Sequence, residues 1–86
     1  RAKGRGPPPS LLIIRHNSAA AKAVHQALQN LPHKSRLKSK TVNRNIVEIT
    51  MEVRLPGDNT MLANEFLNIN GVDDATLVSF QGDYGA

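Results

Sequence analysis

The segment Ile46–Leu55 (IVEITMEVRL) alternates apolar and polar side chains along most of its length. Its odd-numbered residues, from Val47 to Leu55, are all apolar, and most of the residues between them are polar or charged. Side chains of a β-strand point alternately to the two faces of a sheet, so this pattern predicts a strand with one buried face. Such a strand needs partner strands and a covering layer, which the rest of the chain must supply.

The segment Leu11–His16 (LLIIRH) begins with Leu11–Ile14, which is the longest aliphatic stretch of the chain. A strand that is apolar on both faces is typical of a central position in a sheet. Asn17 and Ser18 follow, and their side chains suit the cap of a helix, which we expect at residues 19–30. Pro32 ends this helix.

The segment Ser35–Val42 precedes Ile46–Leu55 closely, so the two are predicted to form a hairpin. A three-residue turn at residues 43–45 sets Lys40 opposite Glu48 and Arg36 opposite Glu52, with Leu37 opposite Met51. A two-residue turn instead sets Lys40 beside Ile49 on the core face. We expect the first register, because opposite charges then face each other and no lysine faces the core. The lysine-rich strand is expected at the sheet edge.

A second helix is expected at residues 60–68, after a turn at residues 56–59, and a last strand at residues 75–81. Asn70-Gly71 supplies the left-handed residue that ends such a helix. The element order is then β-α-β-β-α-β. Right-handed crossovers place both helices on one face of a four-stranded antiparallel sheet, which is the α+β, ferredoxin-like sandwich. The predicted core residues are Ile13, Val24, Leu28, Ile49, Val53, Leu62 and Phe66.

The ends of this domain follow from composition. Residues 1–10 are basic and rich in Gly and Pro, so they are expected to form a flexible tether. Residues 11–84 are expected to form a single domain, because a chain of 86 residues has room for one small core. The longest aliphatic stretch is far shorter than the ~20 residues that span a bilayer. The chain has no Cys for a disulfide or a thiolate metal site.

The charge of the chain is divided between its halves. Residues 1–44 carry ten Lys and Arg and no acid, whereas residues 45–86 carry one Arg and seven acids, so +10 and −6 add to the net charge of +4. Much of this charge can pair within one domain. The basic half also permits contact with an anionic membrane surface or a polyanion.

The loop after the first strand, His16-Asn17-Ser18, is the candidate ligand loop, because ligands bind there in several βαββαβ domains. A single His without Cys or carboxylate neighbours is a poor metal site, so no metal or cofactor is expected. No Ser lies in a G-x-S-x-G motif, and the glycines of the tether form no phosphate loop. The sequence therefore predicts a non-catalytic domain.

Nucleic acid is the alternative partner. RNA-recognition domains of this topology stack bases on aromatic residues of the central strands, and the first three predicted strands have none. Glu48 and Glu52 would face the phosphates. We therefore expect no specific nucleic-acid binding, and at most a nonspecific attraction to the basic residues 34–44.

Self-association is the expected use of the apolar residues that the core does not need. The first strand offers more aliphatic side chains than one buried face requires. We place Leu12 and Ile14 of that strand, with Val42 and Ile46 of the hairpin, in a candidate interface on the open sheet face. The partner is then a second copy or another part of the parent protein.

Several segments of the chain resemble a known family. They are Lys38–Thr41 (KSKT), Val47–Leu55 (VEITMEVRL), Gly71–Asp73 (GVD) and, most specific, Leu77–Tyr84 (LVSFQGDY). These segments resemble the soluble C-terminal domain of an uncharacterised family of bacterial multi-pass membrane proteins, similar in layout to MgtC-type proteins. Ile69–Val72 (INGV) also resembles the helix-to-strand corner of ACT and heavy-metal-associated domains. The likeness covers roughly residues 11–84 and carries over no catalytic residue.

The resemblance implies an ACT-like regulatory or assembly domain on the cytoplasmic side of a membrane protein. A basic tether fits that placement, because Lys and Arg beside membrane helices mark the cytoplasmic side. We therefore expect a cytoplasmic, membrane-tethered regulatory or protein-interaction module that self-associates.

Overall fold

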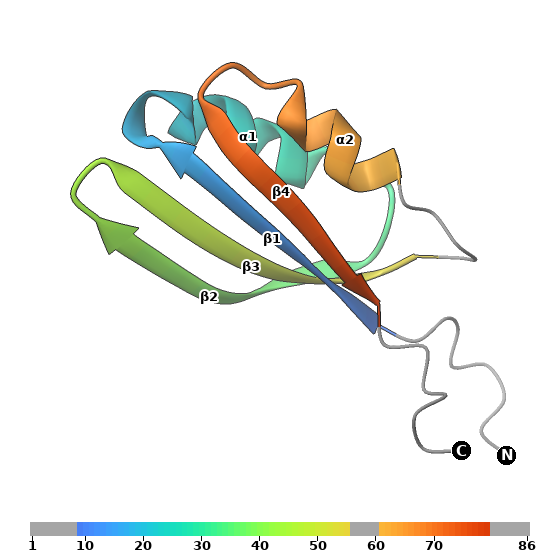
Figure 1. Cartoon of the computed structure of the whole chain (residues 1–86). Helices are drawn as coiled ribbons and strands as arrows, with labels where there is room; N and C mark the ends of the chain where they lie inside the picture. Colours follow the sequence, from blue (N-terminus) through green and yellow to red (C-terminus); the bar gives the residue numbers. More distant parts are fainter. Residues whose placement is uncertain (1–8, 56–60, 80–86) are drawn as a thin grey trace, which may run out of the picture.

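The structure is a computed structural model, and it describes residues 9–55 and 61–79. The elements are, in order, β1 (Pro9–Asn17), a 3-10 turn η1 (Ser18–Ala20), α1 (Ala21–Gln29), β2 (Ser35–Asn43), β3 (Ile46–Arg54), α2 (Met61–Leu67) and β4 (Val72–Ser79). Figure 1 shows the strands side by side with both helices on one side of them. The described residues therefore form a small α+β fold of four strands and two helices, consistent with the predicted class.

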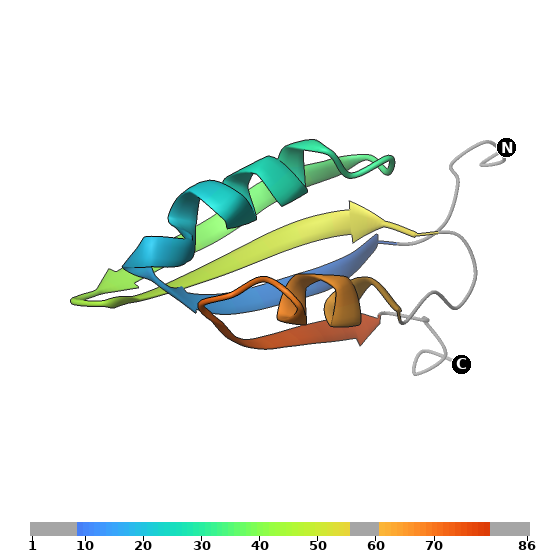
Figure 2. The same cartoon turned by 90° about the horizontal axis from the view of Figure 1, so that it is seen from above.

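The strands form one four-stranded sheet in the order β2-β3-β1-β4. Every neighbouring pair is antiparallel, and β1 and β3 take the two central positions, as their apolar sequences predict. Figure 2, seen from the helix side, shows α1 above the β2–β3 side of the sheet and α2 above the β1–β4 side. This arrangement is a small α+β fold, consistent with the ferredoxin-like class.

The core lies between the helices and one face of the sheet. Alternate residues of the two central strands contribute to it, and each helix adds residues from its inner side. The buried apolar cluster consists of Leu12, Ile14, Ala20, Val24, Val47, Ile49, Met51, Val53, Leu55, Leu62 and Phe66. Five of the seven predicted core residues belong to this cluster, while Leu28 is half-buried against it.

The orientation of β1 differs from the prediction. Leu12 and Ile14 are completely buried on the helix side, and Leu11 and Ile13 lie half-buried on the open face. The prediction of Ile13 in the core is therefore wrong. Sequence could not decide this orientation, because the four aliphatic residues are nearly equivalent and only the pairing with β3 and β4 separates the two faces.

The β2–β3 register follows the prediction at one end only. Arg36 pairs with Glu52 and Leu37 pairs with Met51, as expected, but Lys40 pairs with Ile49 and not with Glu48. The register shifts between Leu37 and Ser39, where one extra residue is accommodated as a bulge.

The turn geometry explains this difference. The hairpin closes on a two-residue turn at Arg44-Asn45, and Arg44 has a positive φ of 54°. Two-residue turns with left-handed residues match the twist of the flanking strands. The predicted register, with its three-residue turn, would have gained only exposed ion pairs, which contribute little to stability.

The corner between α2 and β4 packs against the corner between β1 and η1. The side chain of Asn17 accepts a hydrogen bond from the Ala20 amide at 3.0 Å and so caps the 3-10 turn η1, whereas the N-cap of α1 is Ala20, which makes no side-chain hydrogen bond. The Asn17 amide donates to the carbonyl of Gly71 at 2.9 Å. Gly71 has a φ of 97°, and a β-carbon there would lie 2.8 Å from the side chains of both Ala20 and Asn17. Only glycine suits this close approach.

Some expectations fall outside the described residues. These are most of the tether, the turn at residues 56–59, the end of the last strand at residues 80–81 and the tail that follows it. Pro9 and Ser10, which were assigned to the tether, belong to β1. Within the described part of the chain, no helix has the length and apolar character needed to cross a membrane.

Phe66→Ala is expected to lower the free energy of unfolding by ~3–5 kcal/mol, because it removes a buried ring and leaves a cavity. Urea unfolding followed by circular dichroism measures the change. Leu67→Ala is the control: Leu67 is next in the same helix but 49% exposed, so a loss below about 1 kcal/mol is expected. Equal losses in the two variants would contradict the placement of α2.

Candidate functional site

A groove of about 630 Å³ lies between α1 and the edge strand β2. We call it the α1–β2 groove. It is lined by His25, Leu28, Gln29, Leu31, His33, Ser35, Arg36, Leu37, Lys40, Ile49 and Met51. Its size is in the range of clefts that hold small ligands or peptide side chains.

The groove exists because α1 covers the centre of the sheet better than its edge. Val24 of α1 is fully buried in the core, whereas every residue of β2 is exposed. Leu37 and Val42, at core-face positions of β2, are 56% and 63% exposed. The residues of β2 therefore remain accessible, although α1 lies above this side of the sheet (Figure 2).

The chemistry of the groove combines apolar walls with basic groups. Apolar side chains come from α1, β2, β3 and the loop after α1. They are Leu28, Leu31, Leu37, Ile49 and Met51. The titratable residues of the lining are two His, one Lys and one Arg, and none of the lining residues is an acid. Lys40 belongs to this lining because the observed hairpin register pairs it with Ile49. A ligand that suits these walls is apolar in part and anionic in part.

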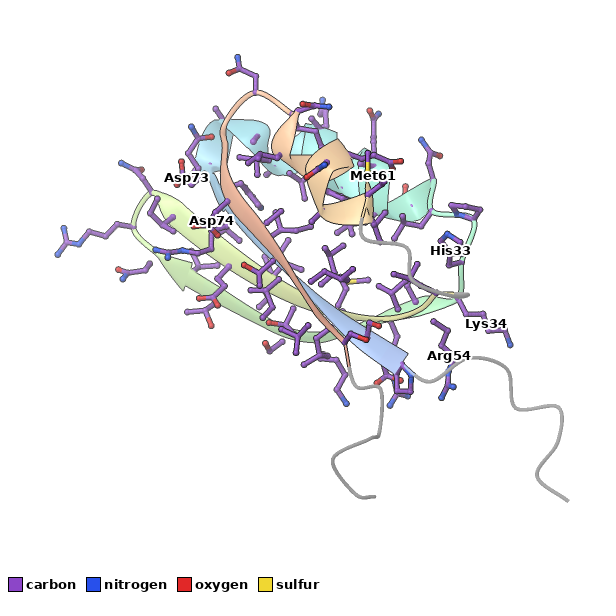
Figure 3. The ribbon with its side chains drawn as sticks, turned by 45° about the vertical axis from the view of Figure 1, so that its right-hand side comes forward. His33, Lys34, Arg54, Met61, Asp73 and Asp74 are labelled. Carbon is purple, nitrogen blue, oxygen red and sulfur yellow. The ribbon has the colours of Figure 1, made fainter. Side chains whose placement is uncertain are left out.

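A cluster of cations lies next to the groove, at the end of the sheet that is near the α1–β2 loop. A shallow depression of about 300 Å³ is lined by Lys34, Ser35, Arg36, Glu52 and Arg54. Figure 3 shows Lys34 and Arg54 there, close to His33, while Asp73 and Asp74 lie at the opposite end of the sheet.

Glu52 is the acid within this cluster. Its Oε1 lies 3.7 Å from Arg36 Nε and 3.6 Å from Lys38 Nζ. One carboxylate is therefore shared by two cations, so the edge keeps an excess of positive charge. Arg36 and Lys38 are 71% and 45% exposed, and the pairs are accordingly weak.

The predicted ligand loop is a packed corner. His16 is only 1% exposed, and its Nδ1 lies 2.6 Å from the Asn17 carbonyl oxygen, to which it donates. Its Nε2 is buried and has no hydrogen-bond partner within the described residues. The Asn17 side chain is engaged in the cap, which leaves Ser18 as the exposed member. The three residues therefore do not converge on an open site.

The structure does not bring the four predicted interface residues together. Leu12 and Ile14 belong to the core, so their assignment to an open-face interface is wrong. Val42 pairs with Val47 and lies on the helix side, whereas Ile46 pairs with Asn17 on the open face. The open face instead carries the half-buried Leu11, Ile13 and Val78. The assignments of Leu12, Ile14 and Val42 failed because each depended on which face of its strand points to the helices, whereas Ile46 lies on the open face as predicted.

Sequence reasoning missed the α1–β2 groove as a site. Its signal in the sequence was the spacing of Leu37 and Val42 in a strand otherwise rich in Lys. The spacing of Leu37 and Val42 could be interpreted only if the bulge was known. The bulge places Leu37, Val42 and Lys40 on the same face of β2. Among the described residues, no three or more His and acidic residues group as a metal site would require.

Comparisons of this chain with models of protein families, with curated proteins and with solved structures found no match. The function of the groove is therefore inferred from its own chemistry.

His16→Leu is expected to leave the free energy of unfolding unchanged or to raise it by about 1 kcal/mol. Leucine fills similar space and removes a buried nitrogen that lacks a partner, although one hydrogen bond is lost. Urea unfolding measures the effect, with His16→Ala as the control that leaves a cavity and should cost ~2–4 kcal/mol. A large loss in His16→Leu would show that the imidazole has an essential partner.

Proposed function

We propose that this domain is a non-catalytic regulatory or protein-interaction module that binds another polypeptide through the side formed by α1 and β2. The observation that carries the proposal is the edge strand β2, exposed at all nine residues and bordered by the α1–β2 groove. Exposed sheet edges bind extended segments through backbone hydrogen bonds, and neighbouring pockets select their side chains. An apolar groove beside such an edge supplies those pockets.

The exposure of Leu37 and Val42 supports this function. Natural proteins protect free edges with charges and bulges, and β2 carries both. Protection of the β2 edge does not by itself explain why two large aliphatic residues, Leu37 and Val42, are exposed beside an open groove. Apolar residues at such a place are typical of a surface that a partner covers.

Association with a second copy or with another part of the parent protein is a second element of the proposal, and it uses a different surface, the open face of the sheet. The ACT-like character, the cytoplasmic location and the tethering to a bacterial membrane protein are part of the proposal, and they are supported by the resemblance described above. The basic tether and β2 would suit an anionic membrane surface in that setting. The half-buried aliphatic residues Leu11, Ile13 and Val78 on the open face are the surface through which two copies would associate.

Leu37→Asp is expected to abolish peptide binding, because it places a carboxylate on the apolar lining of the groove. The measurement is a selection of random peptides displayed on phage against the wild-type chain, followed by binding of the selected peptides to each variant. Leu67→Asp is the matched control, since Leu67 is an exposed leucine of similar accessibility on α2.

Peptides that bind the wild type and Leu67→Asp but not Leu37→Asp would support the proposal. A selection that enriches nothing, or peptides that bind all three proteins equally, would refute it. Sedimentation velocity of the same proteins reports whether a second copy is the partner.

Nonspecific nucleic-acid binding is the alternative, and the observation in its favour is the run of basic residues in and beside β2. Lys34, Arg36, Lys38, Lys40 and Arg44 lie within eleven residues that contain no acid. None of the four described strands carries Phe, Tyr or Trp for stacking. RNA binding that persists in Leu37→Asp, is lost in Lys38→Glu and weakens steeply with salt would favour this alternative.

A further inference from the structure

We propose that the outer edge of β2 accepts an acidic, extended peptide from a partner protein as a fifth strand. The peptide alternates apolar and acidic residues, with its apolar side chains facing the α1–β2 groove and its carboxylates facing the cations of the open face. This inference rests on the proposed function and names the chemical class of the partner.

Two residues of β2 direct their backbone groups toward the free edge of the sheet. The Arg54 amide donates to the Lys34 carbonyl at 3.0 Å, which marks residues 34 and 54 as a hydrogen-bonded pair. Such pairs alternate along an antiparallel ladder with pairs whose backbone groups point outward. Up to the bulge, the amides and carbonyls of Ser35 and Leu37 therefore point away from β3 toward the free edge. A new strand would pair with these two residues.

The helix-side face of β2 favours an apolar residue of the partner strand. Ser35 and Leu37 pair with Val53 and Met51, which are buried on the core side, so both lie on that side of β2. A residue that pairs with Leu37 from outside shares its face. An apolar side chain there would contact Leu37 and reach the groove walls formed by Leu28 and Leu31. This position selects an apolar residue.

The open face of β2 favours an acidic residue of the partner strand. Arg36 pairs with Glu52, and the side chains of Arg36 and Lys38 both approach that carboxylate. Lys34 and Arg54 line the same depression. Among the described residues, Lys34, Arg36 and Lys38 of this edge thus have one neighbouring acid, Glu52. A peptide residue that faces Arg36 from outside would meet this surplus, and a carboxylate is the side chain that it favours.

Charge also distinguishes the partner from a second copy paired through the same strand. Two antiparallel β2 strands would set Arg36, Lys38 and Lys40 of one chain against those of the other. Like charges on facing strands are destabilising. The strand β4 carries acids only at its adjacent residues Asp73 and Asp74, so a second copy paired through β4 would lack acids at alternating positions. The partner strand that best satisfies β2 is therefore an acidic segment of a different protein.

The test uses a fluorescently labelled peptide of alternating glutamate and valine, titrated with the full chain and followed by fluorescence anisotropy. Two control peptides separate pattern from composition: one groups the same residues into a valine block and a glutamate block, and one replaces glutamate with lysine. We expect binding of the alternating acidic peptide, and binding weaker by roughly tenfold or more for each control. Backbone amide shifts in NMR spectra are expected to change first at Ser35–Leu37.

Lys38→Glu is expected to weaken the acidic peptide and to strengthen the lysine peptide, each by roughly three- to tenfold, because it reverses one charge beside the site. Lys22→Glu is the matched control, with the same charge change at an exposed position of α1. Ser35→Pro removes an outward amide without touching the β2–β3 ladder, so it should weaken the peptide while Ser35→Ala does not. Circular dichroism verifies that every variant is folded.

Equal binding of the alternating and block peptides, or an equal effect of Lys38→Glu and Lys22→Glu, would overturn the inference. Shifts confined to β4 or to the open face away from β2 would also overturn it. If phage selection yields peptides that depend on Leu37 but are neither acidic nor alternating, the interaction function stands and only this partner class fails.

Discussion

The pairing of β1 with both β3 and β4 is the constraint on which the rest of the fold depends. Leu12 and Ile14 are completely buried there, and both neighbours are antiparallel to β1. Because side chains alternate, the orientation of this one strand decides which face of all four strands the helices cover. A shift by one residue would expose Leu12 and Ile14 and turn His16, also buried, toward solvent.

Sequence reasoning recovered the features that depend on local chemistry. The order of elements, the central strands, the Asn17 cap and the left-handed Gly71 all follow from patterns within a few residues. It did not recover the orientation of β1, since Leu11–Ile14 offers equal apolar area to both faces. The predicted hairpin register was correct at the end that contains the Arg36–Glu52 pair. It was wrong near the turn, because the two-residue turn there requires a different pairing.

The bulge near Lys38 connects the hairpin to the candidate site. It reconciles a two-residue turn with the pairing of Leu37 and Met51, and it leaves Lys40 on the helix side beside Ile49. A lysine at an apolar position would be costly if α1 covered β2, but the strand is exposed throughout. The site could not be predicted from sequence because it depends on the distance between a nine-residue helix and the edge of the sheet.

Among the described residues, the fold pairs only part of the opposite charges of the two halves of the chain. Glu52 approaches Arg36 and Lys38 of β2, but Asp73 and Asp74 lie on the opposite edge strand, at the other end of the sheet (Figure 3). Exposed charges further apart than about 10 Å are largely screened at moderate salt, so the acids of β4 do little for the cations of β2. The division seen along the sequence thus becomes a difference between two sheet edges. A positively charged edge beside an apolar groove favours partners that carry both acidic and apolar groups, and it disfavours pairing of that edge with itself.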